Sequence, residues 1–227
     1  MNYPMVFFIC QVLTVATELM PVAEGVYVPF AKEMPEQKVE SFQMQKHAVT
    51  NEDFLRFVQS APKYRRSKVP NLMADQNYLR DWTDDLTPPD AKEHHPVTNV
   101  SWYVANAYCR HLGMELPTTA QWELAASAKD YEKQILDWYS APGASDSLVM
   151  STFANVFGIW DLHGLIWEWV LDFDSEAPVQ AEAFCGASAG GTADVSNYTA
   201  FIRYGLRSSL KANYTVRNMG FRCAQNE

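Results

Sequence analysis

Hydrophobic residues in the first half of the chain recur at helical spacing, behind residues that favour a helix start. An extended segment over 39–44 is followed by Phe54 and Phe57, which lie three positions apart. Thr50 or Asn51 can accept a hydrogen bond from the first turn and so act as the N-cap. This pattern predicts a strand and then a helix with one apolar face.

Two more helices are predicted between residues 98 and 126. Ser101 is expected to cap a helix that runs to His111 and ends at Gly113. A second helix is expected to start at Thr118, with Gln121 closing a capping box.

From Asp130 onward, glycine, serine, asparagine and aspartate break the apolar runs into short pieces. The stretch DLHGLIWEWVLD places Glu168 between Trp167 and Trp169. On a strand, the two tryptophans would share one face and Glu168 would lie on the other. A carboxylate behind a core strand needs a partner, because burying it unpaired is costly. Helices followed by irregular β structure predict an α+β fold.

Composition limits the classes of function. The chain has 227 residues, of which 48% are hydrophobic, and this suits one globular domain. Its formal net charge is −9 and it has no long basic run, so nucleic-acid binding is not expected. No phosphate-binding glycine loop occurs.

The N-terminal segment resembles a secretion signal. Residues 4–16 are almost entirely apolar, too short a run to cross a bilayer, and cleavage after Ala16 or Ala23 is plausible. We therefore predict a signal peptide over 1–24, a single domain over 25–227, and export, with the bacterial periplasm as destination. The leader carries no Lys or Arg, which argues for the alternatives, a buried N-terminal strand or a misassigned start codon. No later segment is long and apolar enough for a transmembrane helix.

Four cysteines are present: Cys10, Cys109, Cys185 and Cys223. Removal of the leader would leave three, enough for one disulfide and one thiol. No Cys-x-x-Cys and no His/Cys pair with zinc spacing occurs. Cys185, in the glycine-rich FCGASAGG, is either a redox or metal site or a small core residue. The pair His94-His95 is interpreted as solvated rather than metal-bound.

Three blocks carry a resemblance to a known family. They are PVTNVSWYVANAYCRHLGMELPTTAQWELAA, NVFGIWDLHGLIWEWVLD and RNMGFRCA, in this order. Together they resemble the formylglycine-generating enzyme family, also called the sulfatase-modifying factor family, from Val39 to Ala224. The resemblance implies a C-type-lectin-like fold with two main helices packed on an irregular antiparallel β region.

Members of this family differ in chemistry. The best-known members oxidise a cysteine of a sulfatase to formylglycine, using copper held by two cysteines. Others assist siderophore maturation, accompany copper nitrite reductases or only bind a ligand. Family membership alone therefore does not determine the activity.

The copper-binding cysteines of the oxidases have no counterpart in this chain. They precede an Arg-Ser pair that resembles Arg207-Ser208, and their positions fall near Asp194 and Thr199. Thiolates hold Cu(I) well, whereas carboxylate and hydroxyl groups hold it poorly. The resemblance with this departure predicts that copper is not a cofactor and that the two-cysteine oxidase mechanism is absent.

The resemblance also implies a calcium site and a disulfide. The calcium ligands would be the side chains of Asp161 and Glu168 and the backbone oxygens of Gly164 and Ile166. The alternative is that Glu168 caps the turn by hydrogen bonds without a metal. The disulfide would join Cys109 to Cys223, and the alternative is two buried thiols.

These observations predict an exported accessory or maturation factor that binds a protein, a peptide or a cofactor-bearing partner. The groove in which oxidases hold their substrate would here include Asp194, Thr199, Arg203, Arg207 and Ser208. Two alternatives remain open. One is an oxidoreductase of altered chemistry, in which Cys185 is the candidate catalytic residue, and the other is a non-catalytic binding module.

Overall fold

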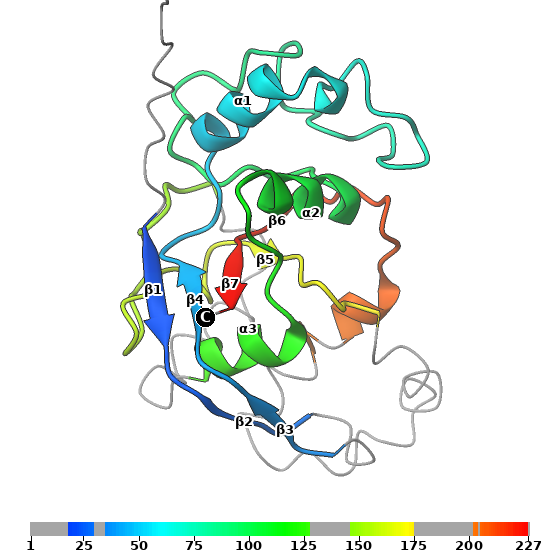
Figure 1. Cartoon of the computed structure of the whole chain (residues 1–227). Helices are drawn as coiled ribbons and strands as arrows, with labels where there is room; N and C mark the ends of the chain where they lie inside the picture. Colours follow the sequence, from blue (N-terminus) through cyan, green and yellow to red (C-terminus); the bar gives the residue numbers. More distant parts are fainter. Residues whose placement is uncertain (1–17, 30–34, 128–145, 175–201, 204, 227) are drawn as a thin grey trace, which may run out of the picture.

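The computed structural model describes residues 18–29, 35–127, 146–174, 202–203 and 205–226 (Figure 1). Four predicted features lie outside these ranges: Cys10, Cys185, Asp194 and Thr199. The predicted signal peptide also falls outside them, apart from its last residues.

A three-stranded antiparallel sheet brings the two ends of the described chain together. Its strands are β1 (Leu19–Val22), β4 (Phe42–Gln45) and β7 (Ala224–Asn226), in the order β1-β4-β7 (Figure 1). Cleavage after Ala23 would remove β1, whereas cleavage after Ala16 would leave this strand in place.

The single strand expected over 39–44 is in fact two strands that belong to different sheets. Strand β3 (Gln37–Val39) pairs with β2 (Gly25–Tyr27), and β4 pairs with β1. The chain changes partner over 40–41, and Val39 and Phe42, on either side, are both buried in the core.

Among the described residues, the structure contains a short 3-10 helix, η1, three α-helices and a further helical segment over 205–209. Their bounds are α1 (Asn51–Ser60), η1 (Pro62–Tyr64), α2 (Trp102–His111) and α3 (Thr119–Ala126). Thr50 caps α1, Ser101 caps α2, and Thr118 forms with Gln121 the predicted capping box of α3. The three helix starts are therefore confirmed, because each cap is a local interaction that sequence spacing reveals.

Aromatic side chains from distant segments form the core between α1 and α2. Phe54 of α1 stacks on Tyr108 of α2, with ring centroids 5.9 Å apart, and Phe221 meets both rings edge-on. Leu72, between η1 and α2, is 82% exposed and takes no part in this core.

A short parallel pair of strands joins the second and third sequence blocks. Strand β5 (Trp167–Glu168) pairs with β6 (Met219–Gly220), in the centre of Figure 1. The backbone at Gly220 lies so close to the carbonyl oxygen of Val97 that a Cβ atom would collide with it. The mixture of α-helices with small, mainly antiparallel sheets confirms the α+β prediction.

Candidate functional site

Glu168 lies in a buried ion pair. Its Oε1 is 2.7 Å from Nη2 of Arg222, its Oε2 is 2.8 Å from Nε, and neither side chain is exposed to solvent. The indole N–H of Trp122 also donates to Oε2, at 2.8 Å. Arg222 uses its remaining N–H groups on the carbonyl oxygens of Gln45 and Trp160. The pair is therefore bidentate and fully hydrogen-bonded, as a buried charge pair must be.

Asp161 holds a different segment of chain. Its carboxylate accepts the backbone N–H of Met150, and Oδ1 accepts the N–H and the hydroxyl of Thr152 at 3.0 and 2.7 Å. Asp161 is almost fully buried and has a positive φ of 58°. Its carboxylate thus fastens 150–152 to the turn that follows.

This arrangement fits the predicted calcium site poorly. A calcium ion needs six to eight oxygen ligands, among them carboxylates free to coordinate it. Both oxygens of Glu168 are engaged by Arg222, whose positive charge would repel a cation. No group of three or more His, Cys, Asp or Glu side chains suited to a metal occurs among the described residues. The calcium assignment, including the backbone oxygens of Gly164 and Ile166, stays a prediction, and the geometry supports the metal-free alternative.

The two arginines predicted for the partner groove converge on one carboxylate. Arg203 donates to Oε1 and Oε2 of Glu123 at 2.9 and 2.6 Å, and Nη1 of Arg207 donates to Oε1 at 2.8 Å. Both guanidinium groups lie over the ring of Trp122, at 5.5 and 5.4 Å from its centroid. Ser208 is close in sequence, but its hydroxyl donates to the backbone oxygen of Gly205.

Charge pairing controls the ionisation of Glu123. Burial raises the pKa of this carboxyl, but Arg203 and Arg207 lower it by more, and the result is about 2 instead of 4.5. The side chain therefore stays ionised in the folded protein far into the acid range.

The protein should lose stability in acid, because the contribution of ionised Glu123 is lost when this carboxyl is protonated. Its folded pKa lies below the unfolded one, so its stabilisation is present above pH 4.5 and is lost as the pH falls toward 2. The full shift of the Glu123 pKa corresponds to about 3 kcal/mol in the free energy of unfolding. We expect Glu123→Gln to be less stable than the wild type at pH 6 but to lose less stability between pH 4.5 and 2. Urea unfolding across this range tests this, with the exposed Glu115→Gln as control; parallel curves for wild type and Glu123→Gln would refute it.

His163 lies next to this group and is buried. Burial lowers its pKa to about 3, with a further contribution from Arg203, so the imidazole is neutral in the folded protein. Its Nε2 lies 3.1 Å from the carbonyl oxygen of Ala126, and its ring meets Trp122 edge-on. His163 thus packs against α3 through Ala126 and Trp122.

Cys109 and Cys223 form a disulfide that connects α2 to the segment just before β7. Both residues are fully buried. The structure thus contains the pairing that the resemblance implies.

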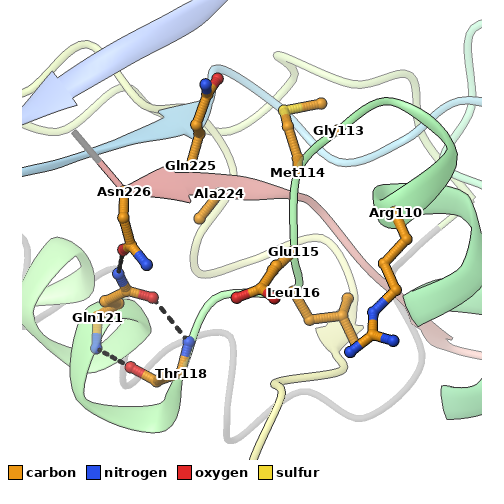
Figure 2. A pocket seen from close by; sticks show the side chains of 10 residues that line it. All are labelled: Arg110, Gly113, Met114, Glu115, Leu116, Thr118, Gln121, Ala224, Gln225 and Asn226. Atoms are coloured by element: carbon orange, nitrogen blue, oxygen red, sulfur yellow. Dashed lines mark hydrogen bonds between the residues drawn. The ribbon is translucent and has the colours of Figure 1, made fainter.

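A pocket of about 460 Å³ lies between the edge of β7 and the connection from α2 to α3 (Figure 2). Gln121 donates to Asn226 at 2.8 Å and accepts from the backbone N–H of Thr118 at 2.9 Å. These polar side chains already form hydrogen bonds that connect α3 to β7. They therefore have few free donors or acceptors for a ligand.

The comparison with protein families agrees with these features. The sequence profile described as "Sulfatase-modifying factor enzyme 1-like domain" matches residues 15–227. The chain belongs to the sulfatase-modifying factor family.

Relatives within the family carry different names. The formylglycine-generating enzyme of Streptomyces coelicolor is 29% identical over 170 residues, which cover 60% of this chain and 54% of the enzyme. The inactive C-alpha-formylglycine-generating enzyme 2 of Mus musculus is 31% identical over 154 residues, covering 58% and 49%. Active and inactive enzymes thus match this chain about equally well.

The serine/threonine-protein kinase pkn1 of Chlamydia pneumoniae is 30% identical over 222 residues. The match covers 86% of this chain but only 35% of the kinase. The chain therefore spans about a third of this relative and corresponds to a sulfatase-modifying factor domain within it.

Solved structures share the fold. CarF matches with a TM-score of 0.53 and 17% identity, over 93% of this chain and 98% of CarF. PvdO from Pseudomonas aeruginosa matches with a TM-score of 0.50 and 17% identity, over 92% and 94%. These likenesses extend the family resemblance to the three-dimensional fold.

Sequence reasoning missed two charged residues of these buried ion pairs. Glu123 was not singled out, although it directly follows Trp122 in a helix with hardly any polar face. Arg222 was not singled out either, although it stands between Phe221 and Cys223, both buried. In both cases the sequence signal was a charged residue within an apolar stretch. The same signal pointed to Glu168, and it applies equally to Glu123 and Arg222.

Proposed function

We propose that this protein is an exported accessory or maturation factor of the family, which binds a protein, peptide or cofactor-bearing partner and lacks two-cysteine copper oxidase activity. One observation carries the proposal: Cys109 and Cys223 are joined to each other. Of the four cysteines, only Cys10 and Cys185 remain. Cys10 lies in the predicted leader, so the mature chain would keep one thiol, too few for a two-thiolate Cu(I) site.

The arginines favour binding over oxidation. Arg203 and Arg207 are held side by side by Glu123 and by the Trp122 ring. Such a fixed pair of guanidinium groups suits recognition, because little side-chain entropy is lost when a partner binds. With Ser208, these residues form the described part of the proposed groove, to which Asp194 and Thr199 would add.

Export agrees with the disulfide, since such bonds persist in oxidising compartments such as the periplasm. No helix among the described residues has the length and apolar character needed to cross a membrane.

Titration with Cu(I) tests the absence of the oxidase site. We expect the purified protein to bind no stoichiometric Cu(I) against a competing chelator, because it lacks a pair of free thiolates. The matched variant is Cys185→Ser. A tight equimolar complex that disappears in this variant would instead support the alternative oxidoreductase built on Cys185.

Gene neighbourhood separates an accessory factor from a general binding module. A gene for a sulfatase or another metalloenzyme beside this one supports the accessory role. Its absence across several genomes would favour a plain binding module.

A further inference from the structure

A second pocket, of about 530 Å³, lies away from the groove residues, between the start of α1, the loop before α2 and residues 217–218. We call it the α1 pocket. The lining residues that matter here are Asn51, Asp81, Lys92, His95, Asn99 and Arg217. None of them belongs to the Glu168 pair or to the Glu123 cluster. The volume is typical of sites for small molecules.

The back wall of the α1 pocket is fixed by hydrogen bonds. The indole N–H of Trp82 donates to Oδ1 of Asn51 at 3.0 Å, and Nδ2 of Asn51 donates to the carbonyl oxygen of Lys92 at 3.0 Å. Asn51 and Trp82 are buried and have their polar groups satisfied. This wall therefore gives the pocket a rigid frame.

Two buried polar atoms of the lining residues lack such partners. Among the described residues, no group forms a hydrogen bond with Oδ1 of Asn99 or with Nδ1 of His95. The orientation of the Asn99 amide is set because its Nδ2 donates to Oδ2 of Asp81 at 3.0 Å, so Oδ1 is the atom left over. Burying an acceptor without a donor is unfavourable, because the acceptor has lost its hydrogen bonds to water. A ligand that donates to Asn99 would remove this cost.

The pocket also has one unpaired charge of each sign. Lys92 and Asp146 neutralise each other at 2.7 Å. Asp81 and Arg217, by contrast, form no ion pair within the part of the chain that the structure describes, and both are exposed. Arg217 lines the pocket together with Lys92 and Asp146, and its charge helps to lower the pKa of Asp146, after the larger effect of the hydrogen bond from Lys92. Asp81, in contact with Asn99, lines the same pocket.

We propose that the α1 pocket binds a small zwitterion that carries a primary ammonium group and a carboxylate, such as a free amino acid or a short peptide. The ammonium group would donate to Asp81 and to Oδ1 of Asn99, two acceptors that already lie together. The carboxylate would pair with Arg217, with His95 nearby to complete its polar surroundings. A ligand with only one charge would leave either Asp81 or Arg217 unmatched. The proposal is independent of the role of the groove.

Calorimetric titration with a series of zwitterions tests the proposal. The probes are glycine, β-alanine, γ-aminobutyrate and diglycine, which differ in the distance between their charges. We expect at least one to bind with unit stoichiometry, and its N-acetylated and amidated forms to bind at least about tenfold more weakly, because each loses one charge pair. Preference for diglycine would indicate a peptide, and preference for another probe a free amino acid.

Two single-charge variants assign the site. Asp81→Asn and Arg217→Gln should each weaken binding about tenfold. Melting temperatures should stay unchanged, because an amide oxygen at position 81 can still accept from Asn99 and because the Arg217 side chain is exposed. Asp174→Asn and Arg110→Gln, exposed and outside the pocket, serve as matched controls. The proposal is overturned if no probe binds, if the blocked probes bind as well as the zwitterion, or if the pocket variants behave like the controls.

Discussion

Replacing both Cys109 and Cys223 with alanine is expected to lower the free energy of unfolding by about 5 kcal/mol. The two cysteines are 114 positions apart, so the bond closes a long loop and strongly restricts the unfolded chain. It also connects α2 with the segment leading into β7, the edge strand of the three-stranded sheet. Urea unfolding of the oxidised wild type and of the double variant measures the difference.

The matched control for this experiment is Cys185→Ala, which removes a cysteine that takes no part in the bond. We expect it to unfold near the wild-type midpoint. If the double variant matched the wild type instead, the disulfide would contribute nothing to stability, and the oxidising environment inferred from it would lose its main support.

Substituting Arg222 by methionine should cost about 3–5 kcal/mol, because it leaves the carboxylate of Glu168 buried with no cation. Within the described part of the chain, the indole N–H of Trp122 would be the donor that remains. The double variant Arg222→Met/Glu168→Leu should recover much of the loss, since replacing both charges removes the unpaired one. Lys38→Met breaks an exposed ion pair and serves as the control.

The wild type and Glu168→Gln decide between the ion pair and the calcium site. If Glu168 ligated calcium, a hundredfold excess of Ca²⁺ over its dissociation constant would stabilise the wild type by about 2.7 kcal/mol. Because Arg222 occupies both oxygens of Glu168, we expect no change in melting temperature on adding Ca²⁺ or a chelator. A clear rise with Ca²⁺ that Glu168→Gln abolishes would restore the calcium assignment.

Local features of the fold could be predicted from the sequence, whereas pairings between distant segments could not. The caps Thr50, Ser101 and Thr118 depend on residues within three positions, and all three are confirmed. The sheet pairs β4 with β1 and β7, from opposite ends of the chain, and no local spacing specifies this. The break in the strand predicted over 39–44 was missed because the change of partner is a tertiary effect.

The same distinction holds for the site. The cost of burying a charge predicted that Glu168 has a partner. The sequence did not indicate which residue this is, because Arg222 lies 54 positions away. Arg203 and Arg207 came from the family resemblance, while the carboxylate that holds them was missed. Glu123 follows an apolar residue in a short helix, and its burial depends on the contacts of Arg203 and Arg207 with α3.

We propose that this chain keeps the scaffold of the family without its copper oxidase chemistry. The most direct test incubates the purified protein with Cu(I), oxygen and a cysteine-containing sulfatase peptide, and follows the peptide by mass spectrometry. The formylglycine-generating enzyme of Streptomyces coelicolor is the positive control. We predict that the peptide keeps its cysteine with this protein while the control converts it to formylglycine. Conversion of the peptide by this protein, lost in Cys185→Ser, would contradict the claim.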